Sequence, residues 1–252
     1  MARWSSGDRP LIATTIVHPE GDATFAAAAW LAPAGLRFTL VPGTQQPGGS
    51  WHTVGEIPPG QRASLVAVFN SGFKYIDIDG GFRAEGRTQV PLVPGEASFV
   101  IRSSGGAEVG AWGETIRDRN DIVAVRQNLK LIVAHGAAAK GLLTNHDGSW
   151  GSKHHQVQFT PRSGIGELRD GSLVYVAGPD LDLQQLADAF VAVHAVTAMQ
   201  LDIHPNMTVF HLFDAGSGTT AGPAHALLDV MTAPLDRYLT TDRRDFIAVN
   251  ER

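Results

Sequence analysis

The sequence predicts an α+β (mixed α/β) fold, a strand-rich single domain with a central mixed sheet and a few packed helices. Short apolar and β-branched runs follow one another along most of the 252 residues, and such runs are typical of strands. The 28 glycines and 14 prolines indicate many turns between these runs. Helical periodicity is confined to the last third of the chain. We expect residues 11–252 to form this domain behind a flexible N-terminal lead over residues 1–10.

The first third of the chain has mainly strand signals. Leu11–Val17 is short and rich in β-branched residues, and residues 24–31 and 36–41 are placed to pair as a hairpin around Pro33-Ala34-Gly35. Ser64–Phe69 is a continuous apolar run, which is typical of a strand buried on both faces. We therefore expect Ser64–Phe69 in the centre of the sheet.

The middle third predicts two hairpins and one divided segment. Ala97–Ile101 and Glu108–Trp112 flank a Ser-Ser-Gly-Gly turn, which predicts a hairpin. The segment Val123–Val133 is long enough for two strand pieces. A second hairpin is expected around the turn Arg169-Asp170-Gly171, with Ser172–Val176 as its returning strand.

The last third contains the predicted helices. Apolar residues recur at helical spacing from Leu183 to His194, with Asp182 as a plausible N-cap, and the helix leads into the strand Met199–Ile203. A shorter helix is expected over residues 224–231, after a proline. Phe246–Val249 is expected to close the sheet as its last strand.

Composition excludes several classes of protein. The net charge of −5 leaves no basic excess for nucleic acid phosphates, so no nucleic acid partner is expected. No run approaches the ~18 apolar residues that span a bilayer, and the N-terminus lacks the apolar region of a signal peptide. There are no cysteines, which excludes disulfides, thiolate zinc sites and cysteine nucleophiles. Phosphate-binding loops, nucleophile elbows and His-Glu-x-x-His motifs are also missing.

The strongest candidate for chemistry is the end of the strand before Pro205. There an apolar run stops at Asp202 and His204, and Asn206 follows the proline that ends the strand. A strand holds the Cα positions while its open end lets a carboxylate and an imidazole reach a ligand. Other polar residues stand at similar positions along the apolar runs: Asn70, Arg126, Asn128 and Arg162.

Structural roles compete with these functional ones. Arg126 interrupts an apolar strand, and a buried arginine needs a partner, which is either Asp202 or a bound anion. The imidazole of His204 is open to a purely structural, half-buried role. The loop residues His146 and Asp147 and the pair His154-His155 have metal-ligand chemistry, but such residues in a polar loop are usually solvated, and no metal site is predicted.

Three segments occur together in this chain: Phe69-Asn70-Ser71-Gly72-Phe73, Arg162-Ser163-Gly164-Ile165-Gly166 and the helix followed by Met199-Gln200-Leu201-Asp202. With these segments the chain resembles the phosphodiester glycosidase family, whose members include an N-acetylglucosamine-1-phosphodiester alpha-N-acetylglucosaminidase and many bacterial proteins linked to exopolysaccharide. The resemblance runs from about residue 11 to the C-terminus. Many members place a Gly/Ser run after the strand aspartate, whereas this chain continues Ile203-His204-Pro205-Asn206.

The likeness is closer to an actinobacterial branch of that family. A departure from this branch is His18-Pro19-Glu20, where Arg-Pro-Asp is usual. The motifs expected for the branch occur here in order: Gly80-Gly81-Phe82, Gly86-Arg87, Pro91-Leu92, Ala97-Ser98, Val125-Arg126-Gln127-Asn128-Leu129 and Arg244-Asp245-Phe246.

The resemblance implies a glycoside hydrolase that cleaves a sugar-1-phosphodiester bond in a glycan or glycoconjugate. Asp202 is expected to act as general base or nucleophile, and His204 to donate a hydrogen bond or carry a proton. Arg126 and Arg162 are expected to hold the phosphodiester, because a guanidinium fork suits phosphate. The expected substrate-binding residues are Asn70, Gly72, Asn128, Ser163, Gly164 and Asn206.

Two other functions remain open from the residues. One is a non-catalytic cell-envelope module that uses the same strand ends to bind an anionic glycan or exopolysaccharide, and the missing Gly/Ser turn after Asp202 favours it. The other is a metal-assisted phosphodiesterase that uses Asp202, His204 and the His146/Asp147 loop. No cofactor is expected, and nothing in the sequence indicates a divalent cation. An anionic carbohydrate or sugar phosphate is the expected partner, and the resemblance implies an extracytoplasmic location.

Overall fold

The fold is built from strands in three antiparallel sheets. The computed structural model describes residues 3–6, 9–19, 24–152 and 157–252. The large sheet has eight strands, in the order β1 (Arg3–Ser6), β2 (Arg9–Val17), β3 (Ala26–Leu31), β14 (Leu173–Leu181), β13 (Thr160–Leu168), β15 (Ala195–Ile203), β11 (Leu131–Ala134) and β12 (Ala137–Ala138).

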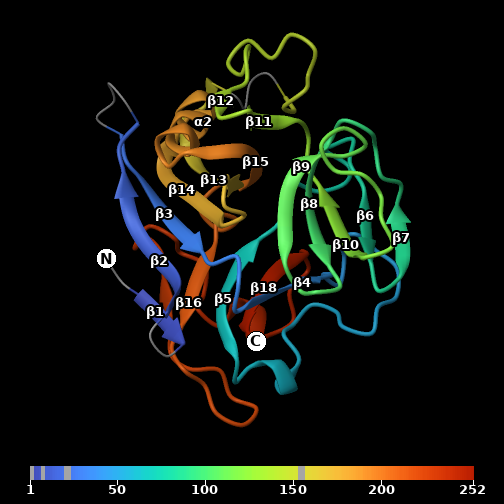
Figure 1. Cartoon of the computed structure of the whole chain (residues 1–252), viewed down its shortest axis with the longest axis vertical. Coiled ribbons are helices and arrows are strands. Elements are labelled where there is room, and N and C mark those ends of the chain that lie inside the picture. Colours follow the sequence, from blue (N-terminus) through green and yellow to red (C-terminus); the bar gives the residue numbers. More distant parts are fainter. Residues whose placement is uncertain (1–2, 7–8, 20–23, 153–156) are drawn as a thin grey trace.

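Two five-stranded sheets complete the structure (Figure 1). The β10 sheet has the order β7 (Arg87–Val90), β6 (Phe82–Ala84), β10 (Ile122–Gln127), β8 (Ala97–Arg102) and β9 (Ala107–Ala111). The β5 sheet has the order β17 (Ala224–Ala226), β16 (Phe210–Phe213), β5 (Leu65–Asn70), β18 (Phe246–Glu251) and β4 (Leu36–Val41).

The predicted α+β class is wrong, because the fold is essentially all-β. In the part of the chain that the structure describes, one α-helix is complete, α2 (Leu183–Ala192), beside two short 3₁₀ turns, η1 (Pro59–Gln61) and η2 (Arg237–Leu239). The second predicted helix, residues 224–231, is the strand β17 followed by turns. The named strands pair antiparallel rather than in a mixed sheet, since short connections between strands favour antiparallel pairs.

Several local predictions are confirmed. Asp182 caps α2 in a capping box with Gln185, and the helix leads directly into β15. Two of the three predicted hairpins are present, as β8–β9 and β13–β14. The long segment from residue 123 to 133 is divided into β10 and β11. The all-buried strand β5 lies in the centre of its sheet.

The predicted pairing of residues 24–31 with 36–41 is wrong. β3 pairs with β2 and β14, whereas β4 pairs with β18 in a different sheet. The turn at Gly35 therefore carries the chain from the large sheet to the β5 sheet. At the N-terminus, β1 and the start of β2 lie within the expected flexible lead, residues 1–10, and they pair with each other.

One apolar core joins the three sheets. Its aromatic centre is Phe69 of the β5 sheet, whose ring lies 6.0 Å from Phe99 of the β10 sheet and 5.5 Å from Tyr175 of the large sheet. The outer face of the large sheet is covered by α2, which contacts β13, β14 and β15. All three sheets therefore bury one face against the same set of side chains.

Candidate functional site

A pocket of about 450 Å³ opens where the ends of the three sheets meet. The large sheet contributes β13 and β15, the β5 sheet contributes the segments after β5 and before β18, and the β10–β11 connection adds Leu129. The lining residues are Phe73, Lys74, Asp77, Leu129, Trp150, Gly151, Ser152, Arg162, Asp202, Ile203, His204, Met207 and Arg244.

Asp202 is the penultimate residue of β15, and it lines this pocket. The strand β15 is buried between β13 and β11, and its amide at Asp202 donates to the carbonyl of Ser71 at 3.0 Å. This bond joins the large sheet to the segment after β5. The sequence placed the carboxylate at the end of a buried strand, and the structure shows the same strand end at the pocket.

The Asp202 carboxylate pairs with Arg244. Nη2 of Arg244 donates to Oδ2 of Asp202 at 2.7 Å, and the amide of Ile203 donates to Oδ1 at 2.9 Å. Burial raises the pKa of Asp202 to about 6, although the neighbouring charge of Arg244 lowers it. The carboxyl group therefore changes its protonation state close to neutral pH.

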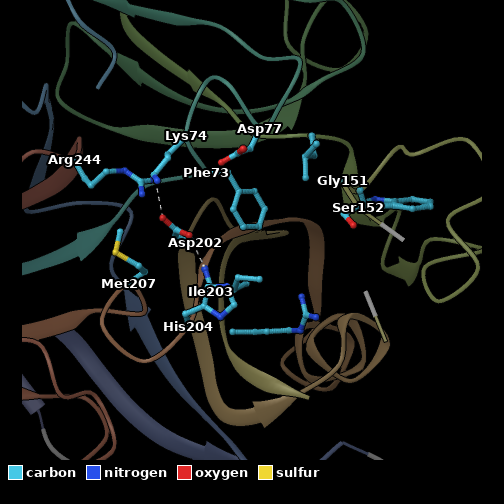
Figure 2. Close-up of a pocket in the computed structure, with 13 residues that line it drawn as sticks. Phe73, Lys74, Asp77, Gly151, Ser152, Asp202, Ile203, His204, Met207 and Arg244 are labelled. Carbon is cyan, nitrogen blue, oxygen red and sulfur yellow. Dashed lines mark hydrogen bonds and ion pairs between the residues drawn. The ribbon is translucent and has the colours of Figure 1, made fainter. Parts of the chain in front are cut away.

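Figure 2 shows how the labelled side chains surround Asp202. Arg244 and Met207 approach from one side, while Gly151 and Ser152 lie on the other, beyond the ring of Phe73. The pocket thus has a cationic side and a side formed by an aromatic ring and a glycine-serine loop.

Two of the six described non-glycine residues with positive φ line this pocket. Leu129 has φ +58° and His204 has φ +81°, both in the left-handed region that side chains with a Cβ rarely adopt. Both residues line the pocket, and strained backbone often marks functional sites. The amide of His204 donates to the carbonyl of Pro161, so the backbone after Asp202 does not offer this amide to a ligand.

Arg162 forms a buried wall of the pocket. Its Nε donates to the carbonyl of Leu181 at 2.7 Å, and its Nη2 donates to the carbonyl of Gln158 at 3.0 Å. Burial lowers the pKa of Arg162 to about 10, against the opposing effect of Asp182. The guanidinium therefore stays charged at neutral pH.

Two cationic residues at the pocket had no predicted role. Arg244 lies just before β18, and Lys74 lies in the segment after β5. The strand register explains why both lie at the pocket. Phe246 pairs with Asn70 in antiparallel strands, so the residues before Phe246 lie alongside the residues after Asn70. The available sequence signal was a charged pair, Arg244-Asp245, directly before the last predicted strand, whereas Asp202 was singled out as a polar residue at the end of an apolar run.

Arg126 lies behind the pocket rather than on its lining. It is 1% exposed and pairs with Asp245, at 2.7 Å between Nε and Oδ2, and not with Asp202. Its other two nitrogens donate to the carbonyls of Gln127 and Phe73. Its predicted part in the chemistry stays a prediction, and the structure gives it protein partners at all three nitrogens.

The predicted substrate-binding residues also lie outside the pocket lining. Asn70 is buried and bonds to Ser163, Tyr175 and Val209, and Asn128 donates to the carbonyl of Gln200. Their substrate roles remain predictions.

Three further predicted residues have local structural partners. A Cβ at Gly164 would lie 2.6 Å from the ring of Phe190, so its lack of a side chain lets α2 approach the sheet. A Cβ at Gly72 would lie 2.7 Å from Cγ of Asn128. Asn206 is exposed and accepts a hydrogen bond from Thr232.

No group of three or more His, Cys, Asp or Glu side chains suited to a metal ion occurs among the described residues. Asp147 lines a neighbouring hollow beside Asp79 and Glu96, and His146 is exposed. His154 and His155 lie outside the described residues. In the described ranges, no helix has the length and apolar character needed to cross a membrane.

Comparisons with known proteins find similarity in structure but not in sequence. No family model matches the chain, and no curated protein matches it. The catalytic domain of zebrafish N-acetylglucosamine-1-phosphodiester alpha-N-acetylglucosaminidase, solved in a form auto-inhibited by its pro-peptide, is similar with a TM-score of 0.61 and 14% identity, over 100% of this chain and 87% of that one. The chain has the fold of that catalytic domain.

Two other solved structures share the fold less closely. A hypothetical protein from Synechocystis has a TM-score of 0.52 and 14% identity, over 97% of this chain and 64% of that one. A putative exported protein from Burkholderia pseudomallei has a TM-score of 0.51 and 10% identity, over 90% of this chain and 74% of that one. At such identities the likeness shows the fold alone, and the comparisons give no support to the actinobacterial branch.

Proposed function

We propose that this chain is a glycosidase that hydrolyses a sugar-1-phosphodiester bond in the pocket around Asp202. The observation that carries the proposal is the Asp202–Arg244 pair, a carboxylate and a guanidinium joined at 2.7 Å on the pocket wall. Lys74 and Arg162 line the same pocket. Cationic side chains bind the negative charge of a phosphodiester, and a carboxylate serves as base or nucleophile for hydrolysis at an anomeric carbon. The fold it shares with a phosphodiester glycosidase catalytic domain supports the proposal.

The reaction depends on a single carboxylate that acts as base or nucleophile, and it depends little on a general acid. As a general base, Asp202 takes a proton from water while the water oxygen bonds to the anomeric carbon. As a nucleophile, a carboxylate oxygen of Asp202 bonds to the anomeric carbon first, and water releases the sugar from Asp202 in a second step. In either case the bond between the anomeric carbon and the phosphate oxygen breaks. The phosphate monoester leaves with the electron pair and needs little protonation.

The cationic side of the pocket would hold the phosphodiester. Arg244 is placed to bind a phosphate oxygen in the position first expected for Arg126, with Lys74 and Arg162 adding positive charge. Phe73 and Trp150 offer aromatic surfaces for the sugar ring. His204, exposed at the pocket edge, is placed to donate a hydrogen bond to either part of the substrate.

The test uses a nitrophenyl-sugar phosphodiester and purified protein in water enriched with oxygen-18. Cleavage at the anomeric carbon puts the label in the sugar, whereas a phosphodiesterase would put it in the phosphate. Asp202→Asn should lower kcat/KM by about 10²–10⁴-fold, the usual contribution of a general base. Label in the phosphate, or turnover by Asp202→Asn close to that of the natural chain, would contradict the proposal.

Asp77→Asn is the matched control. Asp77 is a second carboxylate on the pocket lining, but it is exposed and forms no ion pair with a cation among the described residues. The proposal assigns it no part in the bond cleavage, so this variant should keep kcat within about threefold of the natural chain, as expected for an exposed substitution outside the reacting groups. Tight glycan binding without any product would instead favour the non-catalytic module.

A further inference from the structure

The turn Ser71-Gly72-Phe73 connects two residues of the pocket lining and one residue behind it through its carbonyl groups. The carbonyl of Ser71 accepts from the amide of Asp202 at 3.0 Å, and that of Gly72 accepts from Nη2 of Arg244 at 2.9 Å. The carbonyl of Phe73 accepts from Nη2 of Arg126 at 2.6 Å. A shift of this turn would therefore move the carboxylate and the guanidinium of the Asp202–Arg244 pair together.

A buried ion pair lies directly behind this turn. Oδ2 of Asp245 accepts from Nε of Arg126 at 2.7 Å and from Oγ of Ser71 at 2.5 Å. The side chains of Asp245 and Arg126 are 0% and 1% exposed, and neither lines the pocket. The guanidinium of Arg126 also lies 4.3 Å from the centre of the Tyr75 ring. Asp245 thus holds the turn through a buried contact that is not part of the pocket lining.

A role in stability alone explains this arrangement poorly. Burying two charges costs desolvation energy, and a buried ion pair is often no more stabilising than apolar residues of the same volume. The benefit of such a pair is a defined geometry, since its hydrogen bonds allow few alternatives. Here the ion pair is linked to the turn by two hydrogen bonds: the hydroxyl of Ser71 donates to Asp245, and the carbonyl of Phe73 accepts from Arg126.

We infer that Asp245 and Arg126 are positioning residues of the site, which fix the Ser71–Phe73 turn and through it the relative placement of Asp202 and Arg244. The link to catalysis rests on the proposed function, whereas the link to the geometry of the turn does not. Asp245 is also the chain neighbour of Arg244, so the same residue limits where that guanidinium can lie.

Asp245→Asn and Ser71→Ala test this inference by amide hydrogen exchange and kinetics. Asp245→Asn keeps the shape but removes the charge that Arg126 needs, and Ser71→Ala removes only the hydroxyl link. In both variants the amide of Asp202 should exchange at least about tenfold faster, while the amide of Ala67 in the middle of β5 stays unchanged. kcat should fall by up to about 10²-fold with little change in KM, because misplacement of about 1 Å has that effect.

Gln127→Leu is the control for a merely structural effect. Gln127 neighbours Arg126 and is fully buried, but its side chain bonds to Gly81, Val93 and Ser98, away from the turn. This variant should lower the unfolding temperature while the Asp202 amide and kcat keep their natural values.

The outcomes separate this inference from the proposed function. If the natural chain cleaves no sugar phosphodiester, the proposed function fails, and the exchange of the Asp202 amide still decides the positioning role. If Asp245→Asn does not fold, Ser71→Ala decides it. Folded variants with natural exchange at Asp202 and natural kcat would overturn the inference.

Discussion

Asp202 is almost enclosed by protein and still faces a pocket. Its side chain is 8% exposed and is paired with Arg244, yet burial outweighs this pairing and its pKa is raised. A carboxyl group with these properties is typical of a site that moves protons near neutral pH.

The raised pKa predicts a pH-dependent effect of Asp202→Asn on stability. The folded chain holds this proton more tightly than the unfolded chain, so the group favours folding at low pH, and this contribution is lost as pH rises from the ordinary value of 3.8 through about 6. The unfolding temperature of Asp202→Asn, relative to the natural chain, should therefore rise between these values. Thermal unfolding across this pH range, with Asp77→Asn as control, checks the prediction. A difference that does not change with pH would contradict it.

The ionised form of Asp202 is required if it acts as base or nucleophile. We therefore expect kcat/KM to rise with pH through an apparent pKa of about 6, because this parameter reports the free enzyme. Initial rates over this range measure it. A falling limb at the same pKa would instead indicate that the protonated carboxyl is the active form.

At the scale of elements, the site depends on the close approach of two connections. The turn after β5 lies against the connection from β10 to β11, where Phe73 donates its amide to Oδ1 of Asn128. Gly72 has no room for a side chain because of Asn128. This contact joins the β5 sheet to the β10 sheet beside Phe73 and Leu129, which line the pocket.

Gly72→Ala should disturb this contact. The added Cβ would force Asn128 or the Gly72 carbonyl to move, with a loss of about 1–3 kcal/mol in the free energy of unfolding. Because that carbonyl accepts from Arg244, kcat/KM should fall as well. Denaturant unfolding and steady-state kinetics measure the two effects.

Gly60→Ala is the matched control for Gly72→Ala. A Cβ at Gly60 meets nothing within 4 Å, and its backbone is outside the left-handed region. Equal effects of the two substitutions on stability and kcat/KM would show that crowding at Asn128 is not the cause.

At the scale of the whole molecule, the three sheets share one core and should unfold together. Phe69 contacts rings from the other two sheets, Phe99 and Tyr175. Phe69→Ala should lower the free energy of unfolding by about 3–5 kcal/mol, the usual range for a buried phenylalanine. Near-UV circular dichroism and tryptophan fluorescence should show one common transition. Phe159→Ala, at a side chain that is 56% exposed, is the control and should change stability little.

Separate transitions for the two signals would contradict a shared core. They would show that at least one sheet keeps its structure without the others, and the pocket, which needs all three, would then be lost before the chain is fully unfolded.

Local structure was largely predictable from the sequence. The capped helix α2, the hairpins β8–β9 and β13–β14 and the central strand β5 follow from spacing and turn chemistry over a few residues. The errors arose where a local pattern fits two structures. The segment after Pro223 has helix-like composition, but its first residues pair with β16 as β17, since tertiary contacts override weak propensity.

The partners of strands were less predictable than the strands. β3 and β4 are neighbours in sequence, but they belong to different sheets. A strand pattern defines which faces are apolar and not which strand lies alongside, because pairing across long stretches of chain is decided by burial of the whole sheet.

The sequence by itself determined most of the strands, one capped helix and a carboxylate at the end of a buried strand, because these depend on neighbouring residues. Only the tertiary structure decided which polar strand ends share a pocket. Arg126 and Arg244 look alike as arginines beside apolar runs, yet the packing of three sheets buries the first on Asp245 and leaves the second on Asp202. Burial depends on what the remaining sheets cover, and that information is not local to either residue.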